Sequence, residues 1–425
     1  MAEKRTNYII GSGVDGSGRS ITVSQGTGRK AKKEAKKAKK TREPGLRLID
    51  GSMDPVFFVI VIVMLVYGLI MVFSASYIEG LTYYDDGYRF VRTQGIAAII
   101  GVVVMLFVSF FDYHILMNSN VIVIGYLAML GLLTYTSFFG TENAEARRWI
   151  EIGSFSFQPS EAMKPVLIIF TSFLCVKLLD NPKRQNMPLL RKYFSLLLTL
   201  ALVCFNMVLQ RHISGLLIMG AIWFCVVLLS GIPYKDIAKM TVIIAVGGIS
   251  VLLLYAATRE GGLSYISDRL TSMSTIDEGV ITDDNWQTMQ SLIAIGSGGW
   301  FGLGFGESRQ KYLWLPEAQN DMIISVIVEE LGYIGGLVVI ILFALLVYRG
   351  FRIARKAPDK FGMLITSGIT FQIGLQAILN IGVACNAFPN TGVTLPFFSY
   401  GGSALMIQLV EMGVILGVSR QCENI

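Results

Sequence analysis

A carboxylate at the start of an apolar segment is the side chain of this sequence best placed to do chemistry. Asp321 closes the motif LPEAQND, and an apolar run begins directly after it. That run predicts a membrane-spanning helix, so the carboxylate is expected near the lipid headgroups at a helix N-terminus. There it can cap the first helical turn, which is a common structural role. It can equally accept a proton from a bound hydroxyl group.

A second chemically interesting set lies in a polar segment before another apolar run. Arg147 and Arg148 are followed by Pro159, which suits the first turn of a helix. Glu161 and Lys164 come next, three residues apart and therefore on one helix face. An ion pair at membrane depth is costly unless it has a partner or a purpose. This pair either satisfies itself and orients the helix or contacts a ligand directly.

Ten apolar runs must position these side chains. Each has about 17–25 residues, the length that a helix needs to cross a hydrocarbon core of ~30 Å. Backbone groups in lipid must be satisfied within the segment, so continuous runs predict helices rather than barrel strands. The predicted fold is an all-α polytopic membrane protein with about ten transmembrane helices. The expected spans are residues 55–76, 94–111, 119–138, 162–180, 193–210, 213–231, 237–257, 322–348, 361–384 and 403–420.

The composition agrees with a membrane protein and excludes several other classes. Only 16% of the 425 residues are charged and 53% are hydrophobic, whereas soluble domains have roughly 25% charged residues. The formal net charge of +6 comes almost wholly from residues 1–54, so nucleic acid is not an expected partner. Two histidines and five cysteines without CxxC spacing give no metal-ligand cluster.

The chain divides into a basic tail, residues 1–54, and a transmembrane domain, residues 55–425. The tail is expected to be disordered; its Lys-rich tract either contacts anionic lipid or remains a solvated segment. Basic residues in the short loops place both termini in the cytoplasm by the positive-inside rule. The large loop of residues 257–321, between the seventh and eighth helices, then faces outward. A last outer loop before residue 403, with two prolines and three glycines, predicts a re-entrant segment.

Three long motifs, in the correct order, resemble signature segments of the SEDS family (shape, elongation, division and sporulation), the FtsW/RodA/SpoVE type of bacterial membrane protein. ARRWIEIGSFSFQPSEAMK resembles the family's second outer loop and fourth helix. QSLIAIGSGGWFGLGFGESRQK, followed by LPEAQNDMIISVIVEELG, resembles its large loop and eighth helix. NTGVTLPFFSYGGSALMIQLVEMGVILGVSR resembles its closing signature. The resemblance covers residues from about 55 to 421 and is closer to the FtsW/SpoVE branch than to the RodA branch.

This resemblance implies a peptidoglycan glycosyltransferase that polymerises lipid II on the outer face of the membrane and releases undecaprenyl pyrophosphate. The family assigns the catalytic role to the aspartate of its LPEA motif, which corresponds to Asp321. The reaction needs a base for the acceptor hydroxyl and positive charge for the leaving pyrophosphate. The family positions and the outward cations together predict substrate-binding roles for Arg147, Arg148, Glu161, Lys164, Arg211, Arg309, Lys311, Glu317 and Ser399.

Two segments depart from the family pattern. Gln319 and Asn320 stand where His-Thr is the commoner pair. Residues 210–215 read QRHISG where the family more often has Q-P-D-x-G-T, so Arg211 and His212 replace a proline and an acid. The family pattern therefore assigns no role to this second turn, whereas Asp321 is retained.

The resemblance also implies partners and leaves two alternative functions open. The implied partners are lipid II, a class B penicillin-binding protein and other division or sporulation machinery, at the septum of a bacterial cytoplasmic membrane. No cofactor is required by the sequence, although Mg or Mn could help neutralise pyrophosphate. One alternative is a lipid II flippase, because Glu329, Glu330 and Glu411 lie in apolar segments. The other is a non-catalytic scaffold for the transpeptidase.

Overall fold

The computed structural model describes residues 51–143, 146–152, 155–181, 187–258 and 285–422. Predictions for residues 1–50 and for the central part of the large outer loop, residues 259–284, fall outside this range. A helix is present at each of the ten predicted spans. These helices are α2 (Pro55–Tyr84), α3 (Arg89–Ser109), α4 (Ser119–Phe139), α5 (Pro159–Leu179), α6 (Leu189–Leu209), α7 (Ile213–Leu229), α8 (Tyr234–Thr258), α11 (Ile323–Lys356), α12 (Lys360–Ala384) and α13 (Gly402–Ser419).

The helix lengths and compositions confirm the predicted class of multi-pass membrane protein. Eight helices of the described part are long and apolar enough to cross a membrane, and α7 is a shorter apolar helix of 17 residues. The start of α2 shows how the local sequence determines where a helix begins. The Asp54 side chain accepts a hydrogen bond from the Phe57 amide at 3.0 Å, and Pro55 occupies the first turn of α2. Both features are typical of helix N-termini.

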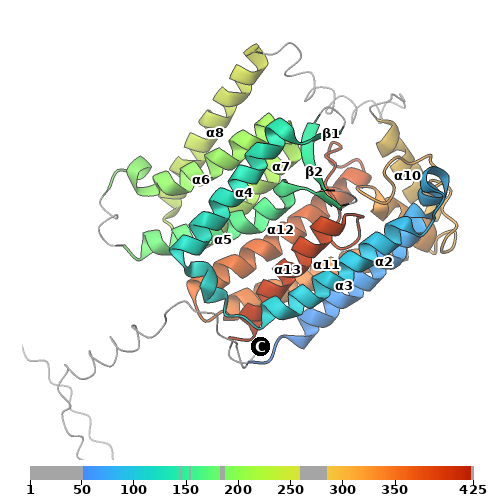
Figure 1. Ribbon diagram of the computed structural model, residues 1–425, viewed down its shortest axis with the longest axis horizontal. Helices are drawn as coiled ribbons and strands as arrows, with labels where there is room; N and C mark the ends of the chain where they lie inside the picture. The colour runs from blue at the N-terminus through green and yellow to red at the C-terminus, as the bar shows by residue number, and fades with distance from the viewer. Residues whose placement is uncertain (1–50, 144–145, 153–154, 182–186, 259–284, 423–425) are drawn as a thin grey trace, which may run out of the picture. The chain divides into compact units, whose positions relative to one another are not determined.

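The last helices of the chain hold the two halves of the bundle together (Figure 1). The orange and red helices α11, α12 and α13 lie between the blue pair α2 and α3 and the green helices α4 to α7. Helix α13 packs along α3, α11 packs along α2, and α12 contacts α5 and α7. Helix α13 also contacts α5 and the segment just before it, so the segments that carry the first and last signature motifs are neighbours in space.

The second outer loop adds a small sheet that the sequence analysis did not predict. Strands β1 (Thr141–Asn143), β2 (Ala146–Ile152) and β3 (Phe155–Phe157) form an antiparallel sheet in that order. Alternating Phe and Ser before Pro159, and alternating Ile and Glu in β2, fit a short hairpin. A three-strand element outside the apolar runs does not change the membrane fold.

Helix α11 is interrupted near its outer end, and a short helix that the sequence did not predict packs against the interruption. Gly332 has φ 71° and ψ −176°, a conformation that only glycine adopts readily. A Cβ atom on Gly332 would lie 2.2 Å from the Trp300 carbonyl oxygen, in the turn that follows α10 (Trp286–Gly298). Glycine at this position therefore lets the backbone of α11 and that of the turn after α10 approach closely.

The last outer loop is re-entrant, as predicted. The Phe397 carbonyl lies so close to Gly68, midway along α2, that a Cβ atom there would be 2.1 Å from its oxygen. Phe398 is fully buried and packs edge-on against Tyr67, with 5.3 Å between ring centroids. The irregular backbone at membrane depth is thus covered by protein on α2 rather than by lipid.

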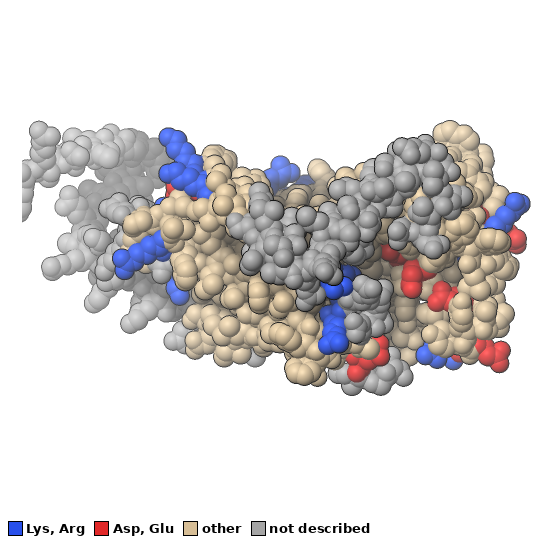
Figure 2. Space-filling model, turned by 90° about the horizontal axis from the view of Figure 1, so that it is seen from above, with Lys and Arg blue, Asp and Glu red and all other residues tan. Residues whose placement is uncertain are grey.

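The opposite end of the bundle, which the positive-inside rule assigns to the cytoplasm, is tied by a histidine cluster. His114, in the 3₁₀ helix η1 (Tyr113–Met117), lies 2.5 Å from Asp112 and 2.7 Å from Asp359. The hydrogen bond to Asp359, together with the one to Asp112, raises the pKa of His114 above its usual value despite partial burial. Much of the surface visible in Figure 2 is uncharged, as expected for a membrane protein.

Candidate functional site

Asp321 precedes helix α11 and does not cap it. The N-cap position of α11 is Met322, and no side chain there makes a capping bond. The Asp321 Oδ1 atom instead accepts a hydrogen bond of 3.1 Å from Gln287 Nε2, in the first turn of α10. The capping alternative for Asp321 is therefore not what the structure adopts. The carboxylate is half-buried and its orientation depends on a neighbouring helix.

Gln287 connects the three segments that surround Asp321. Its amide nitrogen also donates to the Pro316 carbonyl at 3.1 Å, within the LPEAQND motif. Its amide oxygen accepts a hydrogen bond of 2.6 Å from Asn390, in the last outer loop. The Gln287 side chain thus fixes the positions of the Asp321 carboxylate, of the motif before it and of the last outer loop, here called the closing loop, relative to one another.

The closing loop and α12 also bind the backbone that leads into Asp321. Ser399 donates to the Asn320 carbonyl at 2.5 Å, and the Tyr400 amide donates to the Gln319 carbonyl at 2.8 Å. Asn380 of α12 donates to the carbonyls of Asp321 and Val393 at 2.6 and 2.7 Å. The predicted site residue Ser399 therefore stabilises the backbone beside the carboxylate, because its hydroxyl group is hydrogen-bonded to the Asn320 carbonyl.

The two arginines of the second outer loop point in different directions because neighbouring residues of a strand face opposite sides. Arg147 donates to the Phe138 carbonyl at the end of α4, at 2.9 Å. Arg148 donates to the Arg211 carbonyl at 2.7 Å, in the turn between α6 and α7. A hydrogen bond from the Arg148 side chain thus ties β2 to the α6–α7 turn.

The α6–α7 turn, where the sequence departs from the family pattern, reaches the closing loop. Arg211 has φ 51°, so the chain reverses sharply there. The Ser214 hydroxyl donates to the Thr391 carbonyl at 2.6 Å. Thr391 precedes Gly392, where an added Cβ would lie 3.9 Å from Asp321 Oδ2. The predicted residues Arg148 and Arg211 are thereby connected, through Ser214 and the closing loop, to the surroundings of Asp321.

The Glu161–Lys164 pair forms as predicted. Lys164 Nζ lies 2.7 Å from both carboxylate oxygens of Glu161, in the first two turns of α5. Lys164 is buried, and Glu411 of α13, which accepts a bond of 2.9 Å from Gln372, is close enough to interact with both charges. The two charges therefore neutralise each other, on a helix that packs against α12 and α13.

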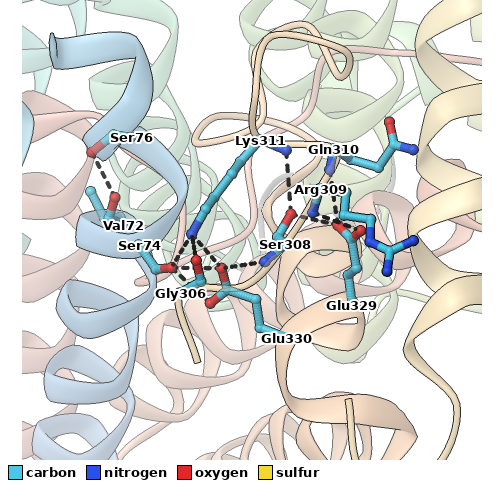
Figure 3. A network of polar contacts seen from close by, with 10 residues as sticks. All are labelled: Val72, Ser74, Ser76, Gly306, Ser308, Arg309, Gln310, Lys311, Glu329 and Glu330. Carbon is cyan, nitrogen blue, oxygen red and sulfur yellow. Dashed lines mark hydrogen bonds and ion pairs between the residues drawn. The ribbon is translucent and has the colours of Figure 1, made fainter. Parts of the chain in front are cut away.

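Lys311 is placed differently from the prediction that it is an outward cation. Its ammonium group is buried and lies 2.9 Å from Glu330 Oε1 of α11 (Figure 3). It also donates to the Gly306 carbonyl at 2.5 Å and to Ser74 of α2 at 3.3 Å. A buried cation needs such partners, and these three leave it inside the protein rather than on the outer surface.

Glu329, next to Glu330, binds a hydroxyl group and a backbone amide of the same loop. Its carboxylate accepts hydrogen bonds from the Ser308 hydroxyl at 2.5 Å and from the Arg309 amide at 3.0 Å (Figure 3). The side chain of the predicted site residue Arg309 is exposed, in contrast to that of Lys311. Glu317 is also exposed, and Asn320 donates a hydrogen bond to its carboxylate.

Several positioning residues were missed by the sequence analysis. Gln287, Asn380, Asn390 and Ser74 are polar side chains in or beside apolar helices, which is the only signal that could have marked them. Their partners are far away in the chain, so the sequence did not indicate what they bind. Two surface hollows of the described part lie elsewhere and contain none of the predicted site residues; one is lined by Met117, Phe173, Val176, Lys177, Asp180 and Asn181.

Comparison with known proteins places this arrangement in a family. The family model described as cell cycle protein, of the FtsW, RodA and SpoVE type, matches residues 54–424. Stage V sporulation protein E of Bacillus subtilis (strain 168) is 35% identical over 370 residues, which are 87% of this chain and 97% of that protein. A probable peptidoglycan glycosyltransferase FtsW of Geobacter sp. (strain M18) is 33% identical over 376 residues, 88% of this chain and 99% of that protein.

Solved structures agree with these relatives. The rod shape determining protein RodA of Thermus thermophilus has a TM-score of 0.61 and 25% identity, covering 88% of this chain and 98% of that chain. A chain from a peptidoglycan synthase complex has a TM-score of 0.67 at 24% identity, covering 88% and 99%, and this likeness concerns the fold. The family match over nearly the whole transmembrane domain and the relatives above 30% identity together show that this chain belongs to the SEDS family, as a member of the FtsW/SpoVE type.

Proposed function

We propose that this protein is a peptidoglycan glycosyltransferase that polymerises lipid II, with Asp321 as the catalytic carboxylate. The observation that carries the proposal is the placement of Asp321: one oxygen is oriented by Gln287, and the backbone on both sides is held by the closing loop and α12. A general base must be held within reach of the proton that it takes. The FtsW relatives are named as probable glycosyltransferases of this kind.

In the proposed reaction, the carboxylate of Asp321 receives the proton of the acceptor C4 hydroxyl. The hydroxyl oxygen then forms a bond to the anomeric carbon of the donor, and the bond from that carbon to the pyrophosphate breaks. The departing pyrophosphate carries the electron pair and needs positive charge nearby. Arg148 and Arg211 are the candidates that the hydrogen bonds tie to the surroundings of Asp321, and the guanidinium fork suits phosphate oxygens.

The role of a divalent cation stays a prediction, because the structure assigns it no set of ligands among the described residues. No three side chains of His, Cys, Asp or Glu come together among the described residues. We therefore derive no step through a metal. A contribution of Mg or Mn through the pyrophosphate remains a prediction, which glycan synthesis before and after EDTA treatment would test.

The decisive assay follows labelled lipid II into glycan strands on a gel, using the full-length protein with and without a class B penicillin-binding protein. We expect strands from the wild type, and a loss of at least a hundredfold in Asp321→Asn, because general acid–base catalysis contributes about 10²–10⁴-fold. Glu307→Gln is a matched control, since this exposed acid belongs to the same loop. Wild-type activity in Asp321→Asn would refute the assignment.

The same preparations distinguish the alternative functions. If neither protein makes strands but lipid II crosses the bilayer of proteoliposomes, the flippase interpretation replaces this one. If strands appear only from the partner and do not depend on Asp321, the protein is a scaffold. We further propose that the partner is a single-span transpeptidase and that the protein is enriched at the septum, which fluorescence microscopy of a tagged full-length chain would test.

A further inference from the structure

The turn that follows α10 carries exposed aromatic and aliphatic side chains and no charge. The sequence from residue 285 to 306 contains no Asp, Glu, Lys or Arg. Within it, Trp300 is 72% exposed and Phe301 is 82% exposed, and Leu303 and Phe305 are exposed as well. We call Trp300, Phe301, Leu303 and Phe305 the apex. Four such neighbours in water would be an unfavourable surface for a soluble loop.

Backbone hydrogen bonds hold the apex at one level of α11. The amides of Leu303 and Gly304 donate to the carbonyls of Glu329 and Glu330 at 2.9 and 3.0 Å. In return, the Tyr333 amide donates to the Gly299 carbonyl at 2.9 Å. These bonds run across the interruption at Gly332, where α11 cannot supply its own partners. The turn therefore forms one unit with the helix and cannot move independently of it.

The length of α11 between the apex and its basic end is close to the thickness of a hydrocarbon core. Arg349, which begins the basic cytoplasmic end of α11, lies seventeen positions after Gly332, and at 1.5 Å per residue this distance is about 25 Å. A hydrocarbon core is about 30 Å thick. The Trp300 ring packs edge-on against Tyr333, with 6.0 Å between centroids. Trp and Tyr are enriched at this boundary between acyl chains and headgroups.

The outward side of α11 at this level is apolar and exposed, like the apex. Tyr333, Ile334, Leu337 and Val338 are each more than 40% exposed on this spanning helix. A helix that crosses a membrane presents such a surface to lipid. Because the Trp300 ring lies against Tyr333, the apex continues the lipid-facing surface of α11 rather than the polar outer surface.

We propose that the apex is a membrane anchor that inserts into the outer leaflet at the boundary between headgroups and acyl chains. Its partner is the lipid surface itself. The anchored turn leads directly into residues 307–311, which Glu329 and Glu330 hold through Ser308 and Lys311. The bilayer thereby fixes the height of the loop that ends at Asp321, which adds a lipid contact to the machinery proposed above without depending on its chemistry.

The test measures quenching of tryptophan fluorescence by brominated phospholipids, with the full-length protein in nanodiscs. Bromines are placed near the glycerol end or deep in the acyl chains in separate preparations. We expect Trp300→Phe to remove the largest single share of the quenching by shallow bromines. Trp314→Phe, which removes another exposed tryptophan of the same loop, is the matched control and should remove less. Adding Phe301→Trp to Trp300→Phe should restore the shallow quenching, because both positions belong to the apex.

Two results would overturn the proposal. If Trp300→Phe leaves lipid quenching unchanged and removes quenching by water-soluble acrylamide instead, the apex lies in water. If the apex becomes shielded from acrylamide only when a transpeptidase is added, it is a protein-docking surface rather than a lipid anchor. Folding of each variant is checked by gel filtration, and the double variant guards against a loss of signal caused by misfolding.

Discussion

Lys311→Met should destabilise the protein strongly, because it leaves Glu330 as an unpaired charge inside the bundle. The two side chains are 5% and 0% exposed, and their charged atoms are 2.9 Å apart. Removing one partner of a buried ion pair costs about 3–5 kcal/mol. At about 1.4 kcal/mol per factor of ten, the unfolding equilibrium should change by roughly 10²-fold to several thousandfold. The Ser74 hydroxyl, which hydrogen-bonds Glu330 at 2.7 Å, cannot neutralise that charge.

A second substitution separates lost charge balance from lost packing. Lys311→Met combined with Glu330→Gln removes both charges while Gln can still accept a hydrogen bond from Ser74. Replacing both partners of a buried pair by uncharged groups is often close to neutral. The double variant should therefore recover most of the lost stability. Its glycan synthesis then reports whether the ion pair also holds the loop that ends at Asp321.

The measurement is an SDS titration in mixed micelles, followed by circular dichroism, for wild type, both single variants and the double variant. The control is Lys192→Met, which breaks the Lys192–Asp236 contact of 3.3 Å between side chains that are 18% and 24% exposed. This pair is partly exposed to water, so breaking it should cost less than breaking the fully buried Lys311–Glu330 pair. The reasoning is refuted if Lys311→Met costs no more than this control, or if the double variant is as unstable as the sum of the two single variants.

Three other perturbations have clear expected results. Gly332→Ala should weaken the packing of α10 on α11 and lower glycan synthesis, since its Cβ would meet the Trp300 carbonyl; Gly125→Ala, with open space around it, should fold and work normally. His114→Gln should remove a pH dependence of Tm: the raised pKa of His114 means that its stabilising effect is complete below about pH 6.5 and is lost as pH rises through the raised value. Gln287→Leu should lower kcat about tenfold or more with a smaller effect on KM, because a hydrogen bond to a charged group contributes about 1.5–3 kcal/mol. Unchanged kcat in Gln287→Leu, or a persistent pH dependence in His114→Gln, would contradict the corresponding argument.

The ten helices at the apolar runs, and their order along the chain, could be predicted from the sequence. Apolar length is a local property, and a backbone in lipid has few alternatives to the helix, so the ten runs determined the ten helices. The Glu161–Lys164 pair was predictable for the same reason, since both residues lie in one helix and the spacing sets their distance. Asp321 stood out because a carboxylate just before an apolar run has a defined position relative to the membrane.

The tertiary structure alone decided how these side chains are used. The sequence predicts that Lys311 is an outward cation of its loop. In the structure it is buried, because Glu330 and Ser74, from two other helices, accept hydrogen bonds from it. Gln287 orients Asp321 across 34 positions of the chain, and Phe397 lies against Gly68 from the other end of the sequence. Neither contact has a local signal. Long-range contacts depend on how helices pack, and packing is a property of all the side chains that meet, whereas the apolar period of each helix depends only on its own residues.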